Sequence, residues 1–124
     1  MSNMYTDVKE FQTAVGQNVG QTTAFPDVSE RHLRKKLLAE EVYEYFEGEE
    51  KDDLENIAKE LADIIYIVCG TAVSYGIPLD RVFSEVHRSN MAKLVDGKPV
   101  RREDGKILKP EGWTPPDIKK VLWP

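Results

Sequence analysis

One stretch of the chain is apolar on almost every side of a helix, and it limits the possible folds more than any other feature. It runs from Ile64 to Val73 within a helical pattern that begins at Asp52 and Asp53 and stops at Gly76. A helix of this kind needs cover on several sides, so it belongs at the centre of a bundle or at a subunit interface.

The rest of the chain predicts helices on both sides of this segment and no strand. Asp27 and Glu30 are spaced as a capping box at the start of one of them. The expected helices run from Met4 to Val15, from Asp27 or Ser29 to the residues before Gly48, from Asp52 or Asp53 to Gly76, and from Pro78 to about Ala92 or Leu94. We therefore predict an all-α fold, a four-helix bundle.

The residues after the last expected helix are rich in proline, glycine and charge without any period, which predicts an extended arm. The whole chain, residues 1–124, is expected to be one domain, with a helical body at 1–94 and a C-terminal arm at 95–124. Apolar side chains from Trp113 to Trp123 are candidates to anchor the arm on the body or on a neighbouring subunit.

Charge is unevenly distributed between the body and the arm. Residues 1–92 carry 17 acidic and 9 basic residues, whereas residues 93–124 carry 8 basic and 5 acidic ones. An acidic body argues against a surface for duplex nucleic acid, while an acidic focus beside a basic tail suits a polyphosphate bridged by metal.

Other patterns exclude several classes of protein. The lone Cys69 permits neither an intrachain disulfide nor a cysteine-rich metal site, and it is expected to be a core thiol. The chain shows no signal-peptide pattern and no apolar run long enough to span a membrane, so we expect a cytoplasmic protein without membrane contact.

The residues that carry chemistry are acids on two of the expected helices. Glu40, Glu41 and Glu44 fall on one arc of about 100° when each residue turns the helix by about 100°. Glu60 and Asp63 are three residues apart, hence neighbours on one helix face, and they lie among core positions of the apolar helix. These carboxylates are expected to converge.

Converging carboxylates repel one another and lose hydration, so the cluster calls for a cation. Oxygen ligands without histidine or cysteine favour Mg²⁺, with Mn²⁺ as a substitute, over zinc. A di-iron bundle would need Glu-x-x-His pairs, which His32 and His87 do not complete. Ser89 has no evident catalytic triad, and Gly16 and Gly20 form no phosphate-binding glycine loop.

The order of these motifs resembles the MazG-like all-α nucleotide pyrophosphohydrolases, in particular the short single-domain type of phages and bacteria. The similarity covers nearly the whole chain and joins the acidic motifs to a basic arm. The residues that carry it are Glu40-Glu41-x-x-Glu44, Glu60-x-x-Asp63, His87-Arg88-Ser89-Asn90-Met91-x-Lys93-Leu94, Asp96-Gly97-Lys98, Glu103-Asp104-Gly105-Lys106 and Pro115-Pro116-Asp117.

The resemblance implies a role for each matching residue. Glu41, Glu44, Glu60 and Asp63 would bind the divalent ions, and Glu40 would orient or deprotonate the attacking water or complete a further metal site. Contacts to the sugar or phosphates of the substrate would come from Asn90 and Lys93, with Arg102, Lys106 and Lys109 as further candidates from the arm. Metal-activated water and neutralised phosphate oxygens would then suffice without a covalent nucleophile.

The sequence therefore predicts a metal-dependent enzyme that converts a (deoxy)nucleoside triphosphate, with dGTP as one candidate, to the monophosphate and pyrophosphate. A non-catalytic module that binds nucleotide or metal is the alternative. The amides of Gln12, Gln17, Asn18 and Gln21 are candidates to read the base. A homodimer or homotetramer is expected, because three partner helices of one short subunit do not easily cover the apolar helix.

Overall fold

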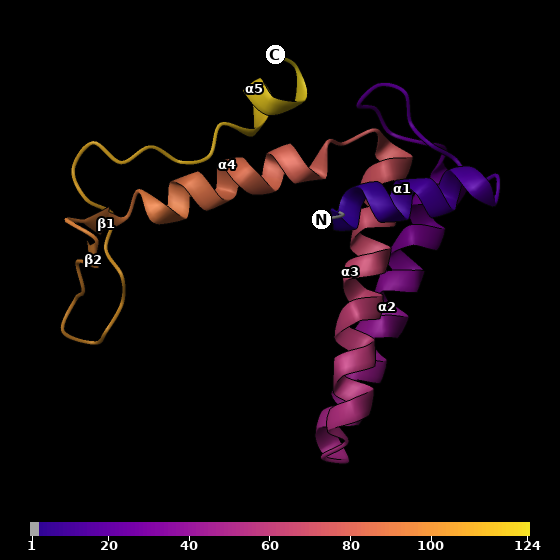
Figure 1. Cartoon of the computed structure of the whole chain (residues 1–124), viewed down its shortest axis with the longest axis horizontal. Coiled ribbons are helices and arrows are strands. Elements are labelled where there is room, and N and C mark those ends of the chain that lie inside the picture. The colour runs from indigo at the N-terminus through magenta and orange to yellow at the C-terminus, as the bar shows by residue number, and fades with distance from the viewer. Residues whose placement is uncertain (1–2) are drawn as a thin grey trace. The chain divides into compact units, whose positions relative to one another are not determined.

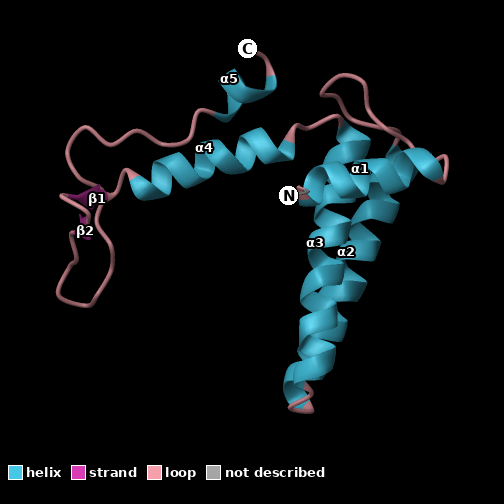
Figure 2. Cartoon of the chain, in the orientation of Figure 1, coloured by secondary structure: helices cyan, strands magenta, loops and turns pink. Residues whose placement is uncertain are grey.

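The computed structural model describes residues 3–124, and helices account for most of them (Figure 2). The prediction of an all-α fold is confirmed. The elements are α1 (Met4–Ala14), α2 (Val28–Glu50), α3 (Leu54–Tyr75), α4 (Leu79–Met91), β1 (Leu94–Val95), β2 (Lys98–Pro99) and α5 (Ile118–Leu122), labelled in Figure 1. The chain divides into two compact units, one that ends at Leu79 and one that spans Asp80–Pro124. The single domain at 1–124 stays a prediction.

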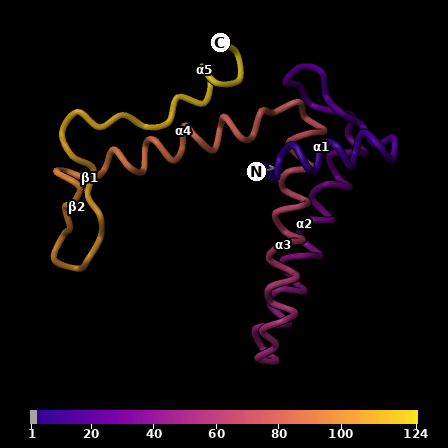
Figure 3. Tube along the Cα trace, in the orientation of Figure 1, coloured from indigo at the N-terminus to yellow at the C-terminus, as the bar shows by residue number. Residues whose placement is uncertain are grey.

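The first unit is a hairpin of two long helices with a third helix against it. α2 and α3 lie side by side and antiparallel, and α1 packs against α3 (Figure 3). The prediction that α2 ends before Gly48 is wrong, because the helix continues to Glu50. Gly48 is buried, and a Cβ atom there would lie 3.1 Å from Cγ1 of Ile57. This glycine thus permits the close approach of α2 and α3 instead of ending a helix.

The predicted caps are present at both long helices. The Asp27 carboxylate accepts a hydrogen bond from the Glu30 backbone N–H at 2.9 Å, and Asp53 caps α3 in the same way. In a full capping box the Glu30 carboxylate would accept a hydrogen bond from the backbone N–H of Asp27. Here it accepts one from Nδ2 of Asn18 at 2.9 Å instead. α3 ends at Gly76, whose left-handed backbone has a φ of 67°.

The loop between α1 and α2 covers the C-terminal end of α3. The backbone N–H groups of Gly20 and Ala24 donate to the carbonyl oxygens of Val73 and Tyr75 at 2.9 and 3.0 Å. Further donors on the loop satisfy the next exposed carbonyls: Asn18 Nδ2 bonds Ser74 O, and Thr23 Oγ1 bonds Gly76 O. The loop therefore supplies the hydrogen bonds that the last turn of a helix lacks.

The apolar core of the described chain is small. Its fully buried apolar side chains are Val8, Cys69, Ala72 and Val73, so the prediction that Cys69 is a core thiol is confirmed. Burial raises the pKa of that thiol. On the same helix Ile65, Tyr66 and Val68 remain exposed, which leaves part of the apolar surface of α3 without cover.

The prediction of no strand is wrong for the second unit. β1 and β2 pair as a two-residue antiparallel ladder, with Val95 opposite Lys98. Asp96 and Gly97 form the turn with φ values of 51° and 76°. Two positive φ values are what a tight hairpin of type I′ requires, and Asp-Gly is among its preferred sequences. The dipeptide was a usable signal that the helix-based interpretation overlooked.

The remainder of the arm is also more ordered than an extended arm. Arg101 and Ile107 form an isolated β-bridge, and Leu108 N–H bonds Val100 O at 2.7 Å, so a second short hairpin follows the first. α5 adds a fifth helix to the four expected, capped by the Asp117 side chain. Between the second hairpin and α5 the chain runs back along α4 (Figure 1).

Candidate functional site

The hairpin of α2 and α3 brings three acids from both predicted motifs together. Glu41 of α2 and Glu60 and Asp63 of α3 each offer a carboxylate oxygen, and these oxygens all lie within 4.8 Å of one another. Glu60 is only 3% exposed, and the other two are half-buried. The spacing along each helix set the direction of the acids, but the contact between Glu41 and Glu60 requires the helices to pack in this register.

Two oxygen atoms of this cluster are suited to a cation. Oε2 of Glu41 and Oε2 of Glu60 are buried, and neither accepts a hydrogen bond from a described residue. A buried carboxylate oxygen without a partner costs free energy that a bound ion would remove. Hard divalent ions such as Mg²⁺ prefer oxygen ligands of this kind, so the donor set fits the expected metal.

Without metal the cluster holds a proton more tightly than a free glutamate does. When Glu41 is protonated, its carboxyl group can donate a hydrogen bond to Glu60, which raises the pKa of Glu41 from 4.5 to about 7, and burial adds to the shift. The charges of Glu44, Glu60 and Asp63 act in the same direction. Metal and proton therefore compete for the same oxygen atoms near neutral pH.

Lys59 supplies a positive charge that the sequence interpretation missed. Its ammonium lies 2.8 Å from Oδ2 of Asp63 and 3.3 Å from Oε1 of Glu60. These two carboxylates raise the pKa of Lys59. The spacing of four residues between Lys59 and Asp63 on one helix was the available signal. One ammonium compensates only part of the charge of the acids around it.

The other two predicted ligands lie on the exposed side of the cluster. Glu44 is exposed, and the charge of Glu60 raises its pKa, so Glu44 is electrostatically part of the group. Glu40 is also exposed and lines a shallow hollow on α2 together with Glu44 and Tyr43. The three-residue cluster does not include either of them. Their roles as ligands or as base stay predictions.

The predicted phosphate contacts fall into two groups within the second unit. Lys93 donates from its ammonium to Oδ1 of Asn90 at 3.1 Å, and the Lys93 and Lys109 ammonium groups both lie over the ring of Trp113. Arg102 instead forms an ion pair with Asp104 in the second hairpin. Lys106 belongs to that hairpin as well, through its backbone bonds to Arg102 and Asp104.

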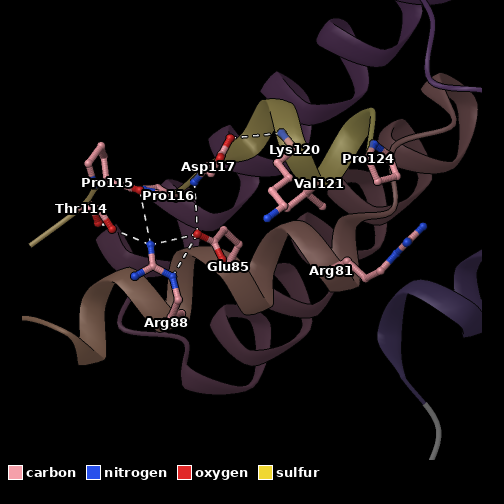
Figure 4. A pocket seen from close by; sticks show the side chains of 10 residues that line it. All are labelled: Arg81, Glu85, Arg88, Thr114, Pro115, Pro116, Asp117, Lys120, Val121 and Pro124. Carbon is pink, nitrogen blue, oxygen red and sulfur yellow. Dashed lines mark hydrogen bonds and ion pairs between the residues drawn. The ribbon is translucent and has the colours of Figure 1, made fainter.

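Polar contacts fix the arm on α4 (Figure 4). Arg88 donates to the carbonyl oxygens of Thr114 and Pro115 at 3.4 and 3.3 Å. Oε1 of Glu85 accepts from Arg88 and from the backbone N–H of Asp117 at 3.1 Å. These bonds lower the pKa of Glu85, the Arg88 guanidinium being the larger cause. Polar contacts thus hold the arm on α4, and packing of its apolar side chains on the body or on a neighbouring subunit stays a prediction.

Most of the amides that were candidates to read a base are used within the fold. Gln12 is buried and donates to Asn18 O at 3.0 Å, and Gln21 donates to Val19 O at 3.2 Å. The Asn18 amide bonds Glu30 and Ser74. These groups hold the α1–α2 loop in place, so sequence alone overstated their availability for a ligand.

The all-α chain thus gathers carboxylates from two paired helices, with two buried oxygen atoms suited to a hard cation. The family model for phosphoribosyl-ATP pyrophosphohydrolase matches residues 8–90, and the chain belongs to this family. The match includes all five predicted acidic ligands and ends before the arm. Membership indicates a pyrophosphohydrolase that acts on a nucleotide, and enzymes of this family are typically dependent on a divalent metal.

The family is an all-α relative of the MazG-like enzymes, so the resemblance holds at that level. The narrower assignment to the short phage and bacterial type stays a prediction. A search of curated proteins found no match. Among residues 3–124, no single helix combines the length and the apolar composition needed to cross a membrane.

Proposed function

We propose that this protein hydrolyses a (deoxy)nucleoside triphosphate to the monophosphate and pyrophosphate with the help of Mg²⁺. The observation that carries the proposal is the cluster of Glu41, Glu60 and Asp63, with two buried carboxylate oxygens that lack a hydrogen-bond donor. In a purely structural cluster, hydrogen-bond donors of the protein would satisfy those oxygen atoms, whereas a metal site leaves them available to bind the ion.

Each group of residues has a task in this reaction. Glu41, Glu60 and Asp63 would hold the metal, and Glu44, whose pKa the charge of Glu60 raises, would complete its ligands. The bound metal supplies charge for the phosphate oxygens and lowers the pKa of water. Glu40, exposed beside Glu44, would orient or deprotonate the attacking water. The predicted contacts to the sugar or phosphates would come from Asn90, Lys93, Arg102, Lys106 and Lys109.

The substrate is the open part of the proposal. dGTP is one candidate among the common triphosphates. Phosphoribosyl-ATP, which the matching family is named for, is another, since it also carries a pyrophosphate bond next to a nucleoside. Both share the triphosphate chain that a carboxylate-bound metal and a basic arm can grip.

The deciding experiment measures pyrophosphate release. The protein is incubated with Mg²⁺ or Mn²⁺ and with each of the eight common nucleoside triphosphates and phosphoribosyl-ATP, and every reaction is repeated in excess EDTA. We expect release from at least one substrate, and none in EDTA. If no substrate is cleaved while a nucleotide still binds in the presence of metal, the protein is the non-catalytic binding module instead.

A further inference from the structure

Trp113 connects the arm to the end of α4. The indole N–H donates to the carbonyl oxygen of Ser89 at 2.6 Å, and the backbone N–H of Trp113 bonds Pro110 O at 3.1 Å. The residue is half-buried, and Ser89 is 3% exposed. The bonds of Arg88 to Thr114 and Pro115 hold the next residues of the arm on the same helix (Figure 4). The ring therefore has a defined position in the second unit.

Two lysines far apart in the sequence share this ring. The ammonium of Lys93 lies 5.8 Å from the ring centroid and that of Lys109 lies 4.8 Å from it. Both distances are within the range of a cation–π contact. The two ammonium groups are thus no farther apart than the sum of these distances. Lys93 is held a second time by its bond to Asn90.

In the described part of the chain, neither of these lysines forms an ion pair with an acid. Within residues 3–124, the ion pairs engage other cations, such as Arg88 with Glu85 and Arg102 with Asp104, and none includes Lys93 or Lys109. Two like charges near one another repel, and the negative face of an indole offsets part of that repulsion. The Lys93 ammonium donates one hydrogen to Asn90, and the ammonium hydrogens that face neither the ring nor Asn90 can bind an anion.

We propose that Trp113 is a positioning residue that holds Lys93 and Lys109 together as one cationic site for the phosphate chain of the substrate. The inference rests on the proposed function, and it adds a residue that lies outside the family match, which ends at residue 90. Two separate ammonium groups suit a chain of two or more phosphates, because each can bind a different phosphate group. The face of the ring holds the two ammonium groups, and the indole N–H fixes the arm on α4 through its bond to Ser89.

The first test is binding without metal. Trp123→Phe leaves Trp113 as the sole tryptophan, so its fluorescence reports on the site. In EDTA, we expect inorganic pyrophosphate to change this emission, and we expect Lys93→Gln and Lys109→Gln each to weaken binding about three- to tenfold. Lys98→Gln, an exposed lysine of β2 without a ring contact, serves as the matched control and should bind like the parent.

The second test uses turnover of whichever triphosphate the protein hydrolyses. We expect Trp113→Leu to raise KM about tenfold and to change kcat less than about twofold, because substrate binding is lost and the chemistry is not. Trp113→Phe keeps an aromatic face but loses the hydrogen bond to Ser89. Its KM should therefore lie between that of the parent and that of Trp113→Leu. A general loss of folding would lower kcat in both variants and would not be relieved by phenylalanine.

The outcomes separate this inference from the proposed function. Pyrophosphate binding that depends on Lys93, Lys109 and Trp113 supports the site even if no triphosphate is hydrolysed. The inference is overturned if hydrolysis occurs while Trp113→Leu and Lys109→Gln keep the parent KM. It is equally overturned if pyrophosphate binds in EDTA with the same affinity to all of these variants.

Discussion

Glu41, Glu60 and Asp63 place like charges within 4.8 Å in a partly buried setting, and this is the main electrostatic conflict at the scale of single residues. Lys59 relieves it from the exposed side for Glu60 and Asp63. Glu41 has no such partner among the described ion pairs, and its pKa is raised by a hydrogen bond with Glu60, by burial and by the neighbouring charges. The conflict is reduced by a proton or by a metal ion.

Glu41 is therefore the residue whose replacement best separates function from stability. We expect Glu41→Gln to reduce pyrophosphate release by more than about a hundredfold, because a metal ligand is lost. In EDTA its free energy of unfolding should equal or exceed that of the parent, since repulsion is removed. Urea unfolding and turnover of the same samples provide the measurement.

Two further variants sharpen this comparison. Asp63→Ala should lose activity similarly, but it also removes the exposed bond to Lys59. Glu50→Gln, an exposed acid of α2 outside the cluster, should keep the parent activity. Parent-like turnover of Glu41→Gln, or its unfolding in metal-free buffer, would show that the acid is structural.

The raised pKa of Glu41 also predicts how stability depends on pH. Its pKa in the folded protein, about 7, is above the ordinary 4.5, so the folded state binds the proton more tightly. The resulting stabilisation is fully present below about pH 4.5 and is lost as the pH rises through 7. In EDTA we expect the protein to lose about 1 kcal/mol from this group between pH 5 and pH 8.

Urea unfolding in EDTA at several pH values measures this loss, with Glu41→Gln as the control that should show a flatter profile. Saturating Mg²⁺ should reduce the dependence, because metal affinity rises as the proton leaves. A parent profile identical to that of Glu41→Gln would contradict the assignment of this pKa to Glu41.

At the scale of elements, the end of α3 depends on two glycines where backbones cross. A Cβ on Gly20 would lie 2.6 Å from the backbone nitrogen of Gly76 and 2.9 Å from the carbonyl oxygen of Ser74. Backbone atoms cannot rotate away as the end of a flexible side chain can. The loop would have to leave the helix end and give up its bonds to the carbonyl oxygens of Val73 and Tyr75.

Gly20→Ala is therefore expected to lower the free energy of unfolding by about 2–4 kcal/mol. Gly76→Ala should cost at least as much, because Gly76 has a left-handed backbone conformation that is unfavourable for alanine. Gly16→Ala is the matched control: its φ is 77°, but nothing lies within 4 Å of the added Cβ, so we expect a loss of only about 1 kcal/mol. Equal losses at Gly16 and Gly20 would show that the crossing is unimportant.

At the scale of the whole molecule, α3 still exposes apolar side chains that a soluble monomer would bury. Leu61, Ile65 and Val68 follow one helical stripe and are 47%, 42% and 38% exposed. Because few apolar residues are fully buried among residues 3–124, this stripe supports the prediction that a second copy covers it.

Light scattering tests this assembly directly. We expect a dimer or tetramer of the 14.1 kDa chain at micromolar concentration. Ile65→Glu combined with Val68→Glu should shift the mass toward the monomer, because two charges would be buried in the interface. Phe83→Glu, an exposed apolar position on α4, should leave the mass unchanged. A parent protein that stays monomeric would contradict the prediction.

Local patterns were enough to predict the helices and the acids. The caps at Asp27 and Asp53, the stop at Gly76 and the pairs within one helix depend on residues a few positions apart, and their geometry follows from the helix itself. The same reasoning predicted the cation requirement of Glu41, Glu60 and Asp63, because helical spacing directs their carboxylates. It also overlooked one local signal, the Asp96-Gly97 hairpin turn.

Other features were decided by tertiary structure. Gly48 lies within α2 and permits the close approach of α3, and the amides of Gln12 and Asn18 bond within the fold. Trp113 contacts two lysines that are distant in sequence, Lys93 before the arm and Lys109 within it. Each of these contacts depends on how segments that are distant in the sequence pack against one another. A helical period determines where a side chain points on its own helix, whereas the neighbour it meets depends on the packing energy of the whole unit.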